Sequence, residues 1–550
     1  MSKELLYHSD ARKRIQSGVN KVADAVKATL GPKGRNVIFR NGDNITVTND
    51  GVTVARQIEL QDEYENLGAL LVKEVAGKTN DDAGDGTTTT TVLLQTILEK
   101  GLKHTEIGND PMLIRDGMNI AVNVAIKTIE EVSQEVKTKE EMKHVATISA
   151  QDSEIGEIIA ESMDALGKDG VITIEESSGY KLESDIVKGM KIARGYASHY
   201  MANQNTNKAE IVAPTVVVTD KKFSSSSEIV PILSKLLPAG KKDIVLFCQE
   251  ITGDALATLV LNKVKGIVNI IAVQIPTVGE YGREVLSDVA YLTGATVISE
   301  ETGIKIQEIT DADLMASLGS ADRIKVTKED TVIVGGQGGQ LQERIDAIQK
   351  EIEEEEDDFK VKKLKERMAK LTGGVGVIKV GGATQTEVKE KLYKVEDALN
   401  ATRAAVEGGI VPGGGIALLR AKFAIENEIG RLKVMSDKPL NDQEELGMRI
   451  IADSLDAPIR QILANAGVMD IALVLEAVKK STNNQEGFNF KQITSGQTSF
   501  NMIDAVKEGI VDPAKVTISA LTNASSVAGS ILTSEVCIVD RVEEKSDKQA

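Results

Sequence analysis

The sequence predicts a multidomain protein of mixed class, in which helical segments at both ends of the chain flank an α/β middle. Its 550 residues exceed the roughly 250–300 at which a single hydrophobic core stops growing. Near both ends, apolar residues recur at three- and four-residue spacing, which is typical of amphipathic helices. Between about residues 171 and 334, short Val- and Ile-rich runs alternate with helical patterns, which is typical of an inserted α/β domain.

The N-terminal part, from about residue 10 to residue 130, is predicted to be mainly helical. Val22 and Val26, for example, lie on one face at helical spacing. Residues 36–39 and 44–48 interrupt this pattern and predict two short strands around an Asn-Gly turn. The first block is therefore helical with one small hairpin.

The middle and C-terminal parts are assigned by the same periodicities. Strands are predicted at residues 211–219, 243–248, 266–273, 294–299 and 375–380. Helices are predicted at residues 228–237, 254–264, 341–352 and 361–371, and from residue 386 onward. The acidic run 353–358 is interpreted as a solvated helix end and connector. Because helical pattern returns to complete the chain, we expect a discontinuous domain that inserted domains interrupt.

Composition and charge exclude several classes of protein. The chain contains 41% hydrophobic residues but no tryptophan, so Val, Ile, Leu and Ala must fill its cores. A net charge of −18 argues against a nucleic-acid partner, which needs a basic surface. Cys248 and Cys537 are far apart, and the four histidines are scattered, so neither a structural zinc site nor a disulfide framework is expected. With neither a signal-peptide pattern nor a run of 18 apolar residues, we expect a cytoplasmic protein without a membrane partner.

The run from Ala83 to Thr91, Ala-Gly-Asp-Gly followed by five threonines, predicts a site for phosphate and a metal ion. Gly84 and Gly86 allow the backbone to approach an anion, and the threonines bring amides and hydroxyls to a helix N-terminus with partial positive charge. Asp85 suits Mg²⁺, which usually takes one or two carboxylates beside phosphate oxygens and water. The alternative is a solvated, threonine-rich turn. The Walker A phosphate loop is absent from the sequence.

Several motifs, taken together and in this order, resemble the group I chaperonins, the family of the bacterial GroEL-type and mitochondrial 60 kDa heat-shock ring proteins. They cover nearly the whole chain and occur at residues 29–36 (Thr-Leu-Gly-Pro-Lys-Gly-Arg-Asn), 49–52, 84–88, 395–398, 401–406, 413–415 and 510–513. Group II chaperonins share two of these motifs and are the less favoured alternative. The sequence around Arg403, and a middle region without an evident helical-protrusion insert, favour group I of bacterial type.

The resemblance implies three domains. These are an equatorial ATPase domain of residues 1–132 and 408–550, an intermediate hinge domain of residues 133–187 and 376–407, and an apical domain of residues 188–375. The apical domain would bind substrate and co-chaperonin. The resemblance also implies a bacterial cytosolic location and a role in the stress response.

For the nucleotide site, the resemblance implies ATP with Mg²⁺ and K⁺. Asp85 matches the Mg²⁺ ligand, and Asp50 and Asp397 match the catalytic carboxylates that orient or activate the attacking water. Without the family, Asp397 is simply an acid on a helix. Because it belongs to the hinge domain, we expect it to act only when that domain closes. The other positions that match ATP contacts are Thr29, Leu30, Gly31, Pro32, Asn49, Gly86, Thr87, Thr88, Thr89, Gly414, Asn489 and Asp512.

Some positions depart from the family pattern. Asn49 stands where the bacterial type usually has lysine, and Asn489-Phe490-Lys491 replaces Asn-Ala-Ala in the segment that contacts the base. The first change removes a positive charge near the phosphates, and the second alters the base-contacting segment. Met469 stands at the position where the family has an acidic inter-ring residue. The sequence therefore supports the stacking of two rings less strongly than it supports the single ring.

The predicted helices at 228–237 and 254–264 carry more apolar residues than one buried stripe requires. Without the family, a core role is favoured for these residues. The resemblance implies instead that they bind unfolded or partly folded polypeptides and a GroES-like co-chaperonin lid. The residues concerned are Tyr196, Tyr200, Met201, Val230, Leu233, Leu256, Val260 and Leu261.

Two functions follow as expectations. The first is an ATP-dependent chaperone that encloses non-native chains under a lid. Its subunits would form a heptameric ring, and two such rings would stack. The second is a ring-forming holding scaffold with weak ATP turnover. Retained Asp50, Asp85 and Asp397 favour the first, whereas Asn49 and the altered segment at Asn489 favour the second.

Overall fold

The structure of the chain is a computed structural model that divides into two compact units. Unit 1 comprises Met1–Glu161, Glu176–Leu182 and Val380–Ala550, and unit 2 comprises Ser162–Glu175 and Glu183–Lys379. The structure describes residues 3–540 apart from 42–43, 168–169, 178, 205, 276–279, 300–308, 340, 356, 358–359, 362–363, 365–366, 369–370, 373, 436–439, 469–470 and 494–500.

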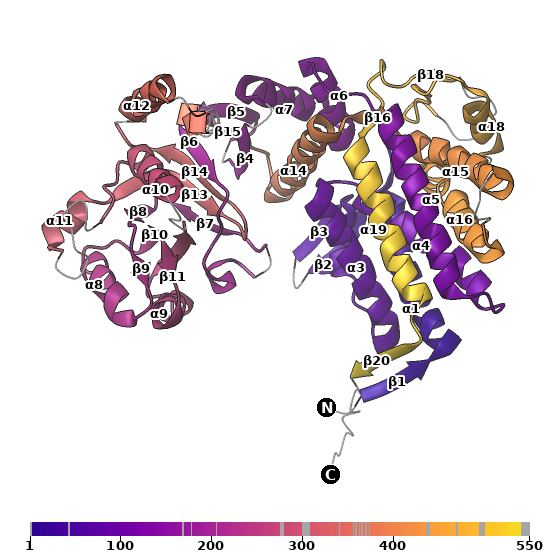
Figure 1. Ribbon diagram of the computed structural model, residues 1–550, viewed down its shortest axis with the longest axis horizontal. Coiled ribbons are helices and arrows are strands. Elements are labelled where there is room, and N and C mark those ends of the chain that lie inside the picture. Colours follow the sequence, from indigo (N-terminus) through magenta and orange to yellow (C-terminus); the bar gives the residue numbers. More distant parts are fainter. Residues whose placement is uncertain are drawn as a thin grey trace, which may run out of the picture. The chain divides into compact units, whose positions relative to one another are not determined.

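Unit 1 is built mainly from long helices that both ends of the chain contribute (Figure 1). Its core helices are α1 (His8–Val26), α3 (Glu63–Ala83), α4 (Thr87–Thr105), α5 (Pro111–Val132), α15 (Ile416–Met435), α16 (Asp442–Ser454) and α19 (Ala514–Leu532). Helix α19, from the C-terminal part, packs against α3, α4 and α5. Apolar residues of all seven helices form one core. The helical pattern predicted for both chain ends is confirmed.

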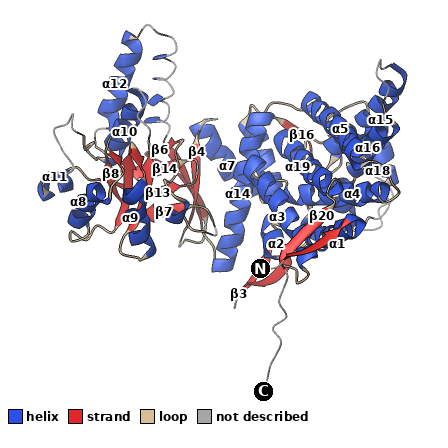
Figure 2. Cartoon of the chain, turned by 60° about the horizontal axis from the view of Figure 1, so that its bottom comes forward, coloured by secondary structure: helices blue, strands red, loops and turns tan. Residues whose placement is uncertain are grey.

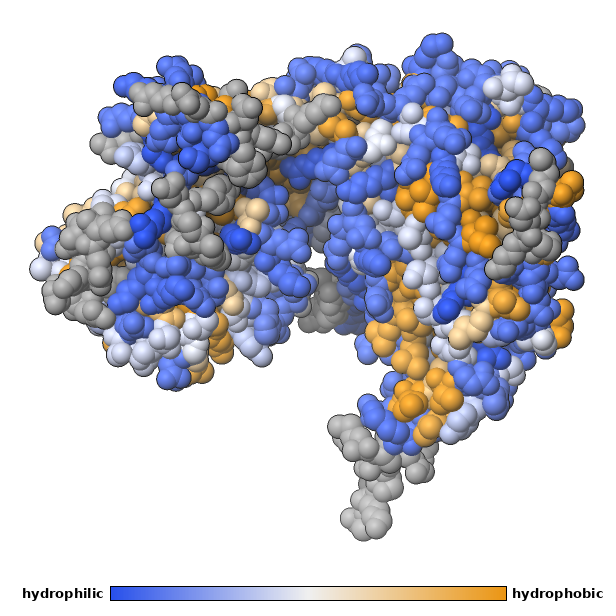
Figure 3. All heavy atoms as spheres, viewed as in Figure 1, coloured by the Kyte–Doolittle hydropathy of each residue, from blue (hydrophilic) through white to orange (hydrophobic). Residues whose placement is uncertain are grey.

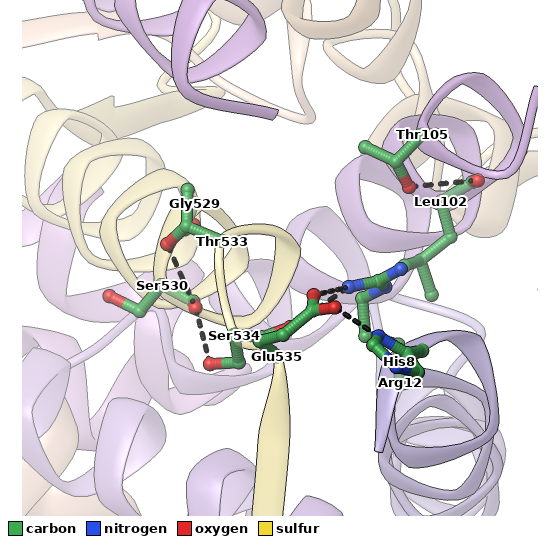
Figure 4. A network of polar contacts seen from close by, with 9 residues as sticks. All are labelled: His8, Arg12, Leu102, Thr105, Gly529, Ser530, Thr533, Ser534 and Glu535. Carbon is green, nitrogen blue, oxygen red and sulfur yellow. Dashed lines mark hydrogen bonds and ion pairs between the residues drawn. The ribbon is translucent and has the colours of Figure 1, made fainter. Parts of the chain in front are cut away.

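A small antiparallel sheet joins the two chain ends, in which β1 (Lys3–Tyr7) pairs with β20 (Val536–Asp540). Leu5 stands opposite Ile538, both side chains are exposed, and Figure 3 shows an apolar patch over these strands. Nearby, the carboxylate of Glu535 accepts a hydrogen bond of 3.0 Å from Arg12 and pairs with His8 (Figure 4). These contacts fix the start of α1 to the end of α19.

Shorter elements surround the core of unit 1. A hairpin of β2 (Val37–Asn41) and β3 (Asn44–Thr48) confirms the two strands predicted there and leads into α2 (Gly51–Gln57). The other helices that position the site are η1 (Lys27–Thr29), α6 (Lys139–Ala150), α14 (Gln385–Gly408), α17 (Ala457–Asn465) and α18 (Ala472–Lys480), together with α7 (Ser153–Leu166), which begins in unit 1. Two short strands, β16 (Ile410–Pro412) and β19 (Val511–Pro513), pair antiparallel.

Unit 2 is an α/β unit around a seven-stranded mixed sheet, whose strands gather together in Figure 2. The strand order is β12-β10-β8-β13-β14-β6, and β7 pairs with β13 outside this path. Strands β8, β10 and β12 run parallel, whereas β13 is antiparallel to β7, β8 and β14. The strands are β6 (Gly189–Ile192), β7 (Ala209–Val212), β8 (Thr215–Val218), β10 (Asp243–Cys248), β12 (Asn269–Gln274), β13 (Gly319–Val326) and β14 (Thr331–Gly336).

Helices cover both faces of this sheet because its central strands are apolar on both sides. On β10, Val245 and Phe247 share a core with α10 (Glu280–Thr293) and α12 (Leu341–Glu354). Its alternate residues, Ile244 and Leu246, share a second core with α8 (Ser226–Leu236) and α9 (Gly253–Val264). A strand buried on both faces carries a continuous apolar run, which is the pattern that predicted it.

Two predicted strands are corrected by the structure. Residues 211–219 form two strands, β7 and β8, because Ala213 adopts a left-handed φ of 48° and the following Pro214 has no amide hydrogen for a ladder. Residues 294–299 contribute only a bridge between Thr219 and Ile298. The helix predicted at 361–371 lies largely outside the described residues. The strand at 375–380 is confirmed as β15 (Val375–Val380), which lies between β4 (Val171–Glu176) and β5 (Leu182–Val187).

The division into equatorial, intermediate and apical domains remains a prediction, since the structure separates two units. Met469, at the predicted inter-ring position, lies outside the described residues. Within the part of the chain that the structure describes, none of the helices combines the length and apolar character needed to cross a membrane.

Candidate functional site

The glycine-rich run forms a sharp turn between two long helices of unit 1. Gly84 and Gly86 adopt left-handed φ angles of 72° and 85°, and α4 begins directly afterwards at Thr87. A Cβ on Gly84 would lie 2.1 Å from the Cβ of Asn400, so only glycine fits there. Helix α4 has no side-chain cap, and its first amides, those of Thr87 to Thr89, have no acceptor within the helix. Such a helix start is suited to binding an anion.

Asp85 lies in this turn and is held by two hydrogen bonds. Its Oδ1 accepts from the amide of Gly86 at 2.5 Å, and its Oδ2 accepts from the hydroxyl of Ser149 at 3.0 Å. Burial raises the pKa of Asp85, and the charge of Asp50 adds to this, although both hydrogen bonds oppose it. Sequence reasoning missed Ser149, because only the fold brings α6 to this turn.

Asp50 lies beside the start of α4. Its carboxylate caps α2 by accepting hydrogen bonds from the amides of Val52 and Thr53, at 3.2 and 2.9 Å. A Cβ on the adjacent Gly51 would lie 2.2 Å from the Oγ1 of Thr88, so the two segments are in close contact. Sequence analysis did not assign this capping role to Asp50. The cap fixes the position of the carboxylate next to the glycine-rich turn.

Helix α14 brings Asp397 to the same place from a distant part of the chain. One and two turns after Asp397, Asn400 lies against Gly84 and Ala404 is buried with Ala83 of α3. Residues at this spacing share one face of a helix. The face of α14 that carries Asp397 therefore covers the turn between α3 and α4.

The charges of Asp50 and Asp85 act on Asp397, so the three carboxylates lie within electrostatic reach of one another. Burial raises the pKa of Asp397 well above its usual range, and the charges of Asp50 and Asp85, with a smaller contribution from Glu396, raise it further. Like charges that approach closely disfavour each other's ionisation. Three acids that are far apart in the sequence thus converge on the N-terminus of α4.

Strands β16 and β19 place Asp512 beside the glycine run at 413–415. Its Oδ2 accepts a hydrogen bond from the amide of Gly414 at 3.0 Å. Burial raises the pKa of Asp512 to about 6, and the charge of Asp85 contributes, while the amides of Gly414 and Gly415 oppose the shift. Asp512 and Gly414, both predicted to contact ATP, are therefore in direct contact with each other.

Replacing Asp512 by asparagine should stabilise the chain at pH 7 in the absence of nucleotide and change its stability little at pH 4. Because the folded-state pKa of about 6 lies above the ordinary value of 3.8, ionisation opposes folding, and this opposition grows as pH rises from about 4 to about 6. At 1.36 kcal/mol per pKa unit, the gain at pH 7 is about 1 to 3 kcal/mol. Urea unfolding of both proteins at the two pH values measures it. Equal gains at pH 4 and pH 7 would contradict the prediction.

The segment predicted to contact the base is folded on itself. The side-chain oxygen of Asn489 accepts a hydrogen bond from the amide of Lys491 at 3.2 Å. Phe490 is buried with Phe488, and its ring lies over Gly414, where a Cβ would be only 2.2 Å from Cε2. Phe490 therefore supports the glycine run, a role that the sequence did not indicate.

The predicted contacts at Thr29 to Pro32 begin at the last residue of η1. The hydroxyl of Thr29 donates to the carbonyl of Val26 at 2.8 Å, Leu30 packs against the apolar core of α17, and Gly31 has a left-handed φ of 81°. Pro32 is exposed, and Asn49 is partly buried next to Asp50. Their contact with a nucleotide stays a prediction.

The turn and its acids suit a nucleotide phosphate with Mg²⁺. Burial and mutual repulsion raise the pKa of Asp85 and Asp397, and a bound cation would relieve both effects. Among the described residues, no group of three His, Cys, Asp or Glu side chains could hold a metal ion by itself. Mg²⁺ needs only one or two carboxylates when phosphate and water complete its shell. Asp85 would hold the ion, and the first amides of α4 would bind the phosphate.

A second candidate surface lies on α8, α9 and the neighbouring residues Tyr200 of η2 (His199–Met201) and Ile267 after α9, in unit 2. Val230 and Leu261, which were predicted to bind polypeptides, are 47% and 57% exposed, and Tyr200 is 53% exposed. Val264 and Ile267 are also exposed and apolar but were missed by the sequence analysis. For Val264 the signal was present in the sequence, since it belongs to the helix predicted at 254–264, whereas Ile267 follows α9 in the segment that was predicted as a strand.

Two residues predicted for this surface are buried in the structure. Met201, at the end of η2 (His199–Met201), is 1% exposed, and its sulfur accepts a hydrogen bond from the amide of Ala272 at 3.3 Å. Leu233 is 6% exposed because it faces the sheet from α8. The other predicted residues, Tyr196, Leu256 and Val260, are partly buried against the two cores.

The fold and the site together define a class of protein. A discontinuous helical unit carries a phosphate-type turn surrounded by carboxylates, and an α/β unit with exposed apolar residues interrupts it. A sequence model of the TCP-1/cpn60 chaperonin family matches residues 22–542. The chain belongs to the TCP-1/cpn60 chaperonin family.

Solved chaperonin structures share the fold. One is the chaperonin gp146 of bacteriophage EL (Pseudomonas aeruginosa), crystallised in the presence of ATP-BeFx, with 23% identity and a TM-score of 0.63 over 98% of this chain and 99% of that chain. A second crystal form of the same protein has 22% identity, a TM-score of 0.61 and the same coverage. The predicted family and multidomain fold are confirmed, whereas group I and the bacterial type stay predictions.

Proposed function

We propose that the chain is an ATP-hydrolysing chaperonin subunit that binds non-native polypeptides and encloses them for folding. Membership in the chaperonin family supports a chaperone role, and crystals of the phage chaperonin with ATP-BeFx support a nucleotide. The observation that carries the proposal is the convergence of Asp50, Asp85 and Asp397 on the first turn of α4.

In the proposed reaction, each group at the turn has its own task. The amides of Thr87 to Thr89 bind phosphate oxygens, and Asp85 holds Mg²⁺. When bound, Mg²⁺ neutralises charge on the phosphates. Asp397, whose pKa is raised by burial and neighbouring charges, accepts the proton of the attacking water. Asp50, fixed by its capping hydrogen bonds, orients that water.

The proposed client surface consists of Tyr200, Val230, Leu261, Val264 and Ile267, named here the α8–α9 surface. An exposed apolar surface of this kind recognises other apolar surface rather than a sequence. Its clients would therefore be unfolded or partly folded chains of many sequences. We further propose group I organisation, with a heptameric ring, two stacked rings, a GroES-like lid, K⁺ dependence and a cytosolic location.

The test measures ATP hydrolysis, assembly size and client capture on the purified chain. We expect hydrolysis that stops when EDTA removes Mg²⁺, a ring-sized mass by light scattering, and suppressed aggregation of an unfolded client. Leu261→Glu places a charge on the α8–α9 surface and should weaken client capture about tenfold, because a buried apolar side chain contributes about 1.5–3 kcal/mol. Val434→Glu, an exposed apolar position on α15, is the matched control and should not change capture.

Two results would overturn the proposal in different ways. A ring that captures clients but hydrolyses no ATP with Mg²⁺ would indicate the holding scaffold, the alternative that the altered segment at Asn489 favours. A monomer that hydrolyses ATP without capturing clients would remove the chaperonin function. Equal losses for Leu261→Glu and Val434→Glu would remove only the assignment of the α8–α9 surface.

A further inference from the structure

Asn465, at the end of α17, bridges the backbone of the turn that follows α1. Its Nδ2 donates to the carbonyl oxygens of Lys27 at 3.0 Å and Leu30 at 2.9 Å. Both carbonyls lie where α1 ends and η1 follows, and that of Lys27 also accepts a hydrogen bond from the amide of Leu30. The carboxamide of Asn465, at least 435 residues away in the chain, thus donates hydrogen bonds to backbone carbonyls at both ends of the η1 turn.

The orientation of this carboxamide is fixed by its partners. Carbonyl oxygens only accept hydrogen bonds, so the nitrogen of Asn465 must face Lys27 and Leu30. Its oxygen then accepts from Nε2 of Gln461, one turn earlier on α17, at 2.8 Å. Each polar atom of the Asn465 side chain therefore has a partner in this one arrangement.

Contacts from α17 add to hydrogen bonds that the turn makes itself, such as the one from the amide of Arg35 to the carbonyl of Ala28 at 2.8 Å. Within the turn, the amide of Leu30 reaches the carbonyl of Lys27 only at 3.3 Å. Beyond it, Gly31 packs against Ile462 of α17, where a Cβ would lie 3.0 Å from Cγ1. Asn465 and Ile462 thus hold Leu30 and Gly31 from the same helix, one by hydrogen bonds and the other by packing.

We propose that Asn465 is a positioning residue for nucleotide binding, which holds the backbone of residues 27–31 in the shape that contacts ATP. The inference rests on the proposed function, in which Thr29 to Pro32 lie against the nucleotide. Asn465 itself does not touch the phosphate-binding turn, so its effect is on affinity and not on the chemical step. Gln461 assists by fixing the carboxamide.

The test compares KM and kcat for ATP, and the Kd for ADP by calorimetry, between the parent chain and its variants. Asn465→Ala should raise KM and Kd about tenfold, which corresponds to about 1.4 kcal/mol, while kcat changes less than about twofold. Asn465→Asp should be worse than Asn465→Ala, because a carboxylate would face two carbonyl oxygens. Gln461→Ala keeps both donated hydrogen bonds and should raise KM about threefold, the factor expected for one hydrogen bond of about 0.7 kcal/mol.

Asn109→Ala is the matched control. Its Nδ2 donates to the carbonyl of His104 at 3.0 Å at the end of α4, so this variant loses a hydrogen bond of the same kind away from the proposed site. The inference is overturned if the parent binds ATP and both Asn465 variants match Asn109→Ala, or if Asn465→Asp equals the parent. If Asn465→Ala does not fold, Gln461→Ala decides, and an unchanged KM there overturns the inference. A parent chain that binds no nucleotide removes the proposed function instead.

Discussion

Replacing Asp397 by asparagine should lower the rate of ATP hydrolysis about a hundredfold or more while nucleotide binding and assembly persist. Asparagine keeps the shape of the side chain but has no group that accepts a proton, and general base catalysis contributes roughly 10²–10⁴-fold. Burial together with the charges of Asp50 and Asp85 raises the pKa of Asp397, which favours its role as a proton acceptor. Single-turnover hydrolysis, with light scattering on the same sample, measures the effect.

The control for this variant is Glu390→Gln. Glu390 lies on the same helix, α14, but pairs with Lys394 at 2.9 Å and is 40% exposed, so its loss should change the rate less than about twofold. If Asp397→Asn hydrolyses ATP as fast as Glu390→Gln, then Asp397 is not the base. If the parent and both variants are equally slow, the holding scaffold replaces the gated ATPase.

The prediction for Asp397 depends on the packing of α14 against the glycine-rich turn. In the structure, Asn400 and Ala404 of α14 pack against the turn that carries Asp85. We predicted from the sequence that Asp397 reaches the phosphate only when its domain closes, and that gating stays a prediction. A variant that separates α14 from the turn, Asn400→Trp, should therefore slow hydrolysis without changing Asp397 itself.

Replacing Asp288 by alanine should destabilise unit 2 by about 3–5 kcal/mol, the usual effect of removing one partner of a buried ion pair. Asp288 is 2% exposed. Its two oxygens accept hydrogen bonds from Nε and Nη2 of Arg367 at 3.0 and 2.9 Å, and Nε of Arg344 donates to Oδ1 at 3.0 Å. Without the carboxylate, two guanidinium groups that are 3% and 14% exposed lose their most buried partner.

The position of these three residues explains the size of the effect. Asp288 belongs to α10, Arg344 belongs to α12, and Arg367 lies in the region that follows α12. The cluster therefore links three segments that cover one face of the seven-stranded sheet. Arg367 also pairs with Glu284 one turn earlier on α10, so that carboxylate keeps part of the cluster together in the variant.

Urea unfolding, with hydrogen exchange of the amides in unit 2 as the readout, measures the change in the free energy of unfolding. Asp311→Ala is the control, because Asp311 pairs with Lys235 at 2.8 Å but its side chain is 80% exposed. Removing this ion pair should lower the free energy of unfolding by less than about 1 kcal/mol, as for other exposed ion pairs. Equal effects of the two substitutions would show that the buried cluster contributes no more than a surface pair does.

Local sequence pattern predicted most of the elements correctly because it reflects local constraints. The continuous apolar run at 243–248 predicted a strand buried on both faces, and β10 is that strand. At residues 211–219, where the prediction failed, a single backbone feature decided the outcome. The left-handed φ of Ala213, followed by Pro214, breaks one expected strand into two. No periodicity of apolar residues reports such a break.

The sequence by itself determined the chaperonin family, the mixed multidomain fold and the identity of the acids at the candidate site. These are carried by motifs whose residue types and spacing are visible along the chain, such as Gly84-Asp85-Gly86 before five threonines. Only the tertiary structure decided that Ser149 holds Asp85, and that Met201 is buried while Val264 is exposed. The physical reason is that burial, pKa and hydrogen bonding depend on neighbours from distant parts of the chain, whereas motifs and periodicity depend on residues next to one another.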